Sequence, residues 1–113
     1  MGWIRHHAII VTSGDESALI KAHQVAVQCG FEEIQVSNIV EGVINGYFSF
    51  FVGPDGSKEG WDASDIGNER RDNFIVWLRE QRHLDWVEVQ YGDDYKETII
   101  VRHRDEMQDN EEW

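Results

Sequence analysis

The chain has 113 residues, enough for one domain that buries a real core without disulfide staples. Its composition, 41% hydrophobic and 12% aromatic, excludes a disordered chain, and its single cysteine excludes an internal disulfide. Ten basic against 22 acidic residues give a formal net charge of −12, which disfavours binding to nucleic-acid phosphates or to anionic membranes.

The chain opens with a predicted strand and helix. Residues 3–12 become β-branched and apolar towards their end, as in a strand buried on both faces. Ser13 and Glu16 match a capping box, which predicts a helix that starts there. Apolar residues then recur at three- and four-residue spacing, and Gly30 supplies the left-handed residue that commonly ends a helix.

A β-hairpin is predicted next. Residues 34–40 alternate with the period of a strand, and residues 47–52 form a second, strongly aromatic run. Asn45 and Gly46 between them are a strong signal for a type I′ turn. The aromatic run has apolar residues for both faces, which predicts a strand inside the sheet.

The second helix is predicted from Asp62 or Ser64 to about His83, with Ser64 as its N-cap. Its expected buried stripe consists of Ile66, Phe74, Trp77 and Leu78. The arginines of this helix, Arg71 among them, fall on other faces. Gly67 in the first turns costs about 1 kcal/mol relative to alanine, which indicates that something approaches the backbone closely there.

Two further strands, residues 86–91 and 97–103, complete the order β-α-β-β-α-β-β. This order predicts an α+β fold, a ferredoxin-like sandwich with a mostly antiparallel sheet and both helices on one face. Residues 1–103 then form a single domain, and the acidic residues 104–113 form a tail that we expect to be disordered. The other sheet face would stay open, and its apolar residues predict a homodimer.

No motif in the chain carries a recognised chemistry. The patterns that arrange a nucleophile, bind phosphate in a glycine-rich loop or hold zinc are absent from the sequence, so we assign no catalytic residue, no metal ligand and no cofactor. His6 and His7 are neighbours on a strand, so their side chains point to opposite faces. A pairing of His7 with His103 across strands would reopen the metal hypothesis. Whether the protein is an enzyme stays open, and the missing motifs favour a non-enzyme.

The region of residues 53–71 carries the clearest candidate site. Residues 53–62 hold the only proline, three glycines and Trp61, and such a loop is either functional or a structural loop whose Trp61 caps the core. The residues of a possible site for a small, nucleotide-like anion are Lys58, Trp61, Asn68, Arg70 and Arg71. Interleaved carboxylates leave open the alternative of salt bridges within the chain.

The acidity of the chain favours a different function. It predicts a small non-catalytic binding protein that docks on a basic surface of a partner protein, as an inhibitor or accessory factor. Asp93, Asp94 and Glu97 near the last turn are the expected partner-binding residues. The sequence has no membrane-spanning apolar run and no signal-peptide pattern, so we expect a cytoplasmic protein with no direct nucleic-acid or membrane partner. The small-anion binder, or modest enzyme, at residues 53–71 is the alternative.

Overall fold

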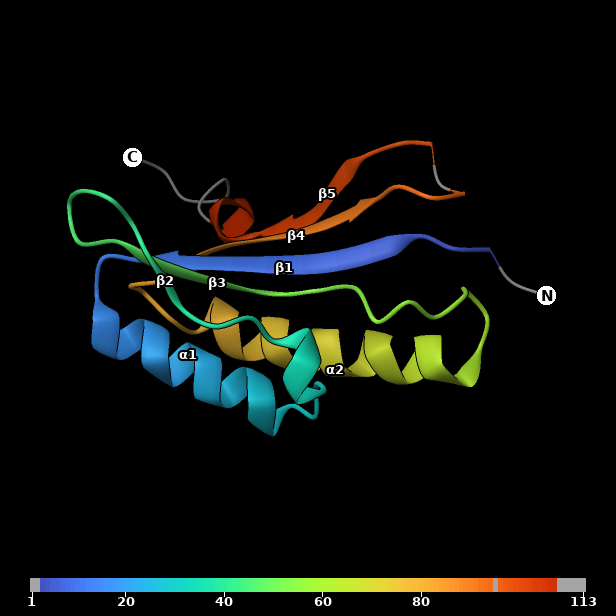
Figure 1. Ribbon diagram of the computed structural model, residues 1–113, viewed down its shortest axis with the longest axis horizontal. Coiled ribbons are helices and arrows are strands. Elements are labelled where there is room, and N and C mark those ends of the chain that lie inside the picture. The colour runs from blue at the N-terminus through green and yellow to red at the C-terminus, as the bar shows by residue number, and fades with distance from the viewer. Residues whose placement is uncertain (1–2, 95, 108–113) are drawn as a thin grey trace.

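The computed structural model describes residues 3–94 and 96–107. These residues form two layers, a five-stranded antiparallel sheet and two helices packed on one of its faces (Figure 1). The strands follow the order β2-β3-β1-β4-β5, so β1 lies in the middle. Their bounds are His6–Ser13 for β1, Val40–Glu41 for β2, Phe48–Val52 for β3, Asp85–Tyr91 for β4 and Ile99–His103 for β5. The predicted α+β class is confirmed.

The first helix begins later than the sequence pattern predicts. Helix α1 spans Glu16–Gln28, and its N-cap is Asp15, whose carboxylate accepts a hydrogen bond from the Ala18 amide. Ser13 is the buried last residue of β1, and its hydroxyl donates to the His83 carbonyl. The capping-box prediction is wrong because Ser13 pairs with Phe48 as the last residue of β1, and its hydroxyl oxygen accepts from the Asp15 amide rather than from the first turn of α1.

The predicted strand at residues 34–40 is largely wrong as well. Residues Glu33–Gln35 form the short 3-10 helix η1, and only β2 follows as a strand. Ser37 explains part of this, because its hydroxyl accepts the Phe51 amide that a regular ladder would pair with a backbone carbonyl. The turn itself is confirmed, since Asn45 and Gly46 both have a φ of 66°, as a type I′ turn requires.

The second helix, α2, spans Asp62–Arg79 with Trp61 at its N-cap position. Ser64 is therefore not the N-cap; it lies inside the helix and is buried. Phe74 and Leu78 are buried as predicted, but Ile66 is half exposed. Arg71, assigned to another face by the sequence pattern, is instead among the buried residues of the helix.

The apolar core fills the space between the sheet and the helices. Its main contributors are Ile9, Val11, Phe50, Val52 and Trp86 from the sheet and Leu19, Ala22, Phe74, Ile75 and Leu78 from the helices. Beyond β5, residues Arg104–Met107 form a second short 3-10 helix, η2, where the sequence predicts a disordered tail. Residues 108–113 of that tail lie outside the described part of the chain. Within the described ranges, no helix has the length and apolarity needed to cross a membrane.

The sheet face opposite the helices is open, as expected. Side chains from β1, β3 and β4 line a shallow apolar groove of about 470 Å³ there, which includes Ile10, Phe51, Val89 and Tyr91. Ile10 is 43% exposed and Phe51 is 45% exposed. The homodimer remains a prediction.

Candidate functional site

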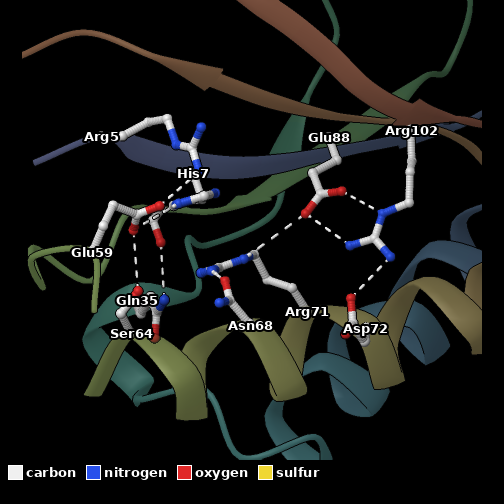
Figure 2. Close-up of polar contacts among 11 residues, drawn as sticks. Arg5, His7, Gln35, Glu59, Ser64, Asn68, Arg71, Asp72, Glu88 and Arg102 are labelled. Carbon is white, nitrogen blue, oxygen red and sulfur yellow. Dashed lines mark hydrogen bonds and ion pairs between the residues drawn. The ribbon is translucent and has the colours of Figure 1, made fainter. Parts of the chain in front are cut away.

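One part of the helix–sheet interface is polar. There the first half of α2 faces β1, β4 and β5 across a cavity of about 330 Å³ (Figure 2). Its lining is Arg5, His7, Glu59, Asn68, Arg71, Asp72, Glu88, Gln90, Val101 and Arg102. We call this space the polar cavity. Three arginines face three carboxylates in it, so its charges nearly balance.

Glu88 on β4 is the carboxylate of the polar cavity that contacts both Arg102 and Arg71. It is only 2% exposed, and its carboxylate accepts hydrogen bonds from Arg102 Nε at 2.5 Å and Arg102 Nη2 at 3.0 Å. Arg102 comes from β5 and also reaches Asp72 on α2, with 2.9 Å between Nη1 and Oδ1. The hydrogen bonds to Glu88 raise the pKa of Arg102, so its guanidinium stays protonated. The two ion pairs of Arg102 thereby connect β5 to β4 and to α2.

Arg71 on α2 is the buried arginine of the cavity. It is 3% exposed, its Nη2 donates to the Asn68 side chain, and its Nε is 3.8 Å from Glu88 Oε2. Burial lowers the pKa of Arg71, while the charges of Asp55 and Glu88 oppose that shift. A guanidinium remains protonated under these conditions. The buried face of α2 therefore carries a permanent positive charge at Arg71.

Glu59 brings the long loop into the cavity. Backbone contacts hold the loop beside the start of the chain. The Glu59 amide donates to the Trp3 carbonyl at 2.8 Å, and the backbone of Lys58 forms an isolated antiparallel β-bridge with Ile4. The Glu59 carboxylate then accepts from Arg5 Nη2 at 2.7 Å and from the Ser64 hydroxyl at 3.1 Å. Burial acts to raise the pKa of Glu59, but the hydrogen bonds from Arg5 and His7 hold it below its usual value.

His7 is the neutral base of the polar cavity. Its side chain is buried on the helix side of β1, with Nε2 3.3 Å from Glu59 Oε2. Burial, and then the positive charge of Arg71, lower the pKa of His7. An ionised carboxylate can only accept hydrogen bonds. His7 Nε2 therefore carries the ring hydrogen and donates a hydrogen bond to the Glu59 carboxylate. A neutral imidazole oriented by a carboxylate is an arrangement that proteins use for binding and for proton transfer.

The predicted ligand residues do not form one site. Asn68 and Arg71 line the polar cavity, whereas Trp61 and Arg70 line a separate groove of about 430 Å³ beside α1. Successive helical residues point about 100° apart, and here Arg70 lies beside Gly30 at the end of α1 while Arg71 lies beside Glu88 on β4. Lys58 places its ammonium 5.7 Å from the centre of the Trp61 ring.

Trp61 does not cap the core. Its side chain is 48% exposed, so the structural alternative for the loop is wrong in this respect. The loop is held by polar contacts instead: Asp55 accepts from the Ser57 amide and hydroxyl, and Glu59 bonds into the polar cavity. The expected close approach at Gly67 is confirmed, since Asp55 Oδ2 lies 2.6 Å from where a Cβ would be.

The predicted partner-binding acids lie on and beside the β4–β5 turn, where all three are exposed. Asp94 binds the start of the chain, because its carboxylate accepts from the Ile4 amide at 2.8 Å. Asp93 lies 3.5 Å from His6 Nε2. Glu97 follows the turn and is exposed. Asp94 therefore has a structural role besides the predicted one.

Sequence reasoning missed most of the polar cavity. The available signal was the alternation in β4, where Glu88 occupies an inward position between Trp86 and Gln90. Arg102 lies directly opposite Glu88 in the β4–β5 register. His7 does not pair with His103, since their register partners are Gln90 and Val87. Across residues 3–94 and 96–107, no three His, Cys, Asp or Glu side chains are grouped so as to hold a metal ion.

Comparison with known proteins finds no matching family model, curated protein or solved structure. The function of the chain has to be inferred from its own residues.

Proposed function

We propose that this protein is a small non-catalytic binding protein whose acidic surface docks on a basic surface of a partner protein. The observation that best supports this proposal is the distribution of charged side chains on the surface. In the described part of the chain, sixteen acidic side chains are exposed, whereas the exposed basic ones are Lys21, Arg79, Arg82 and Lys96. Exposed acids thus outnumber exposed bases about four to one, against about two to one in the whole sequence.

The cause of this imbalance is the use of basic side chains in ion pairs within the fold. Arg5 pairs with Glu59, and both Arg71 and Arg102 pair with the buried Glu88. The remaining exposed carboxylates produce a negative field that speeds association with a cationic protein and opposes the approach of phosphates. The proposal accordingly includes no direct nucleic-acid partner and no membrane partner.

The test begins with capture of a partner protein from a cell lysate and continues with measurement of its association kinetics. Docking of this kind predicts an association rate that falls steeply as salt is added. Asp93→Lys together with Glu97→Lys should slow association severalfold if the last hairpin is the docking side, and Asp94 is left intact because it binds Ile4. Lys96→Glu on the same hairpin is the control with the opposite change of charge. A rate that is insensitive to salt would contradict the proposal.

The finer fold assignment belongs to the same proposal. A ferredoxin-like sandwich is supported by the position of β1 between β3 and β4, with β2 beyond β3. The sheet differs from a four-stranded sheet of that kind by β5, which pairs with the outer side of β4. We also propose that the protein acts as an inhibitor or accessory factor and that it is located in the cytoplasm.

Self-association through the open sheet face is also part of the proposal. The groove on that face is lined by uncharged residues, Phe51 and Tyr91 among them. Two copies of a chain with a net charge of −12 repel each other least where no carboxylate lies at the contact. The open face is therefore the surface on which a second copy can bury apolar area at the lowest electrostatic cost.

A second function is favoured by the polar cavity. Asn68 and Arg71, two residues of the predicted ligand set, line it together with Arg5 and Arg102. Guanidinium groups bind small anions through paired hydrogen bonds, which supports a small-anion site here. Calorimetric titration with inorganic phosphate tests this: Arg71→Met should abolish binding, whereas Arg104→Met, which removes an arginine paired with exposed Asp85, should not. No heat of binding to the unmodified protein would contradict it.

A further inference from the structure

A groove between the start of α2 and the end of α1 has the features of a binding site for a side chain. We call it the Trp61 groove. It has a volume of about 430 Å³ and is lined by Trp61 at the N-cap position of α2, Ile66 within α2 and Phe31 after α1. Phe31 belongs to the core, while Trp61 and Ile66 are each about half exposed. An exposed tryptophan beside an exposed isoleucine leaves apolar surface that a partner can cover.

The charges at the Trp61 groove are mainly negative. Glu32 and Asp55 both line it and are exposed. Among the described residues, the Glu32 side chain has no hydrogen bond or ion pair. Asp62 and Glu69 lie on the exposed outer face of α2, each about one helical turn from Ile66. An anion entering the groove would meet these carboxylates, which argues against a nucleotide-like ligand at Trp61.

Of the two basic residues here, Arg70 lines the groove, and Lys58 lies next to Trp61 without lining it. Arg70 lies beside Gly30 at the C-terminal end of α1, where a cation complements the helix dipole. Lys58 places its ammonium over the Trp61 ring, so this indole already faces a cation within the chain.

We propose that the Trp61 groove binds an arginine side chain of the basic partner protein. An arginine fits because its planar guanidinium stacks on an indole face and forks onto a carboxylate, while its methylenes cover apolar surface. Here the indole is Trp61, the apolar surface is Ile66 and the carboxylate is Glu32. The inference rests on the proposed docking function and adds to it the place and the side chain that are recognised.

The experiment is a nuclear magnetic resonance titration of the ¹⁵N-labelled full chain with a blocked Gly-Leu-Arg-Leu-Gly peptide. The counterparts with Lys and with Glu in place of Arg are titrated in parallel. The Arg peptide should shift the Trp61 indole N–H and the Ile66 and Gly67 amides in a saturable way, and should bind more tightly than the Lys peptide. Trp61→Ala should weaken binding about two- to fivefold, the size of an exposed cation–π contact. Trp61→Phe should recover part of the loss.

Glu32→Gln and Glu41→Gln form a matched pair, since each removes one exposed carboxylate. Glu32→Gln should weaken binding of the Arg peptide by up to about fivefold, and Glu41→Gln should leave it unchanged. Equal weakening by both variants would overturn the groove assignment while leaving docking by general acidity in place. The absence of saturable binding by either basic peptide would overturn the docking function as well. Tighter binding of the Glu peptide would overturn both and favour the small-anion alternative.

Discussion

Replacing Glu88 by glutamine should strongly destabilise the fold. The substitution keeps the size of the side chain but removes the charge that faces Arg71, which is 3% exposed, and Arg102. Breaking a buried ion pair from one side costs roughly 3–5 kcal/mol, because the remaining charge stays buried without its partner. For a domain of this size each kcal/mol corresponds to roughly 4 °C in Tm, so the variant should melt at least about 12 °C below the unmodified protein.

Thermal unfolding followed by circular dichroism measures this effect. The control is Asp85→Asn, which removes the exposed partner of Arg104 and should cost less than about 1 kcal/mol. A triple variant, Arg71→Met, Glu88→Leu and Arg102→Met, replaces the Glu88 cluster by apolar side chains and should recover most of the lost stability. If Glu88→Gln melts within a few degrees of the unmodified protein, the charge of Glu88 does not balance Arg71 and the reasoning fails.

Three further predictions concern His7, Trp61 and the open sheet face. Because burial and Arg71 lower the pKa of His7, the unfolded chain, whose imidazole pKa is about 6.5, binds more protons. The free energy of unfolding should therefore fall as the pH drops below about 6.5, and a titration that shows the same slope in His7→Gln contradicts this. Trp61→Ala should cost about 1 kcal/mol in urea unfolding, and a loss near the roughly 3–5 kcal/mol of a buried tryptophan would mean that the side chain is buried in solution. Light scattering should give about twice 13.2 kDa for the unmodified chain and a monomer for Phe51→Asp, and a monomer in both cases would exclude the homodimer.

The parts of the fold that the sequence predicts well are those where local signals and tertiary packing agree. Asn45 and Gly46 adopt the left-handed conformation that their residue types favour, and Gly30 does the same after α1. Ser13 fails as an N-cap prediction because it is the last residue of β1 and Asp15 caps α1, and Ser64 fails because α2 already begins at Asp62. A helix-capping pattern describes only neighbours along the chain, so it does not include the pairing of Ser13 with Phe48 across β1 and β3.

The candidate site shows the same limit more clearly. Asn68 and Arg71 were found because they follow a glycine-rich loop, but their partners come from separate strands. Glu88 interrupts the apolar side of β4, and that position is informative only once β5 is known to place Arg102 opposite. The sequence therefore contains the charges of the polar cavity without the register that brings them together.

That register offers a physical reason for keeping charges inside a small domain. β5 is an edge strand in which no residue is fully buried, so apolar burial alone holds it weakly. A slip of one residue would turn Arg102 to the open face and leave Glu88 and Arg71 buried without it. A buried charge without its partner is costly, so the Glu88–Arg102 pair selects one alignment of β5, and Asp72 extends that selection to α2. The acidic outer face of α2 and the Trp61 groove are thereby held in a fixed position, which is what a docking surface requires.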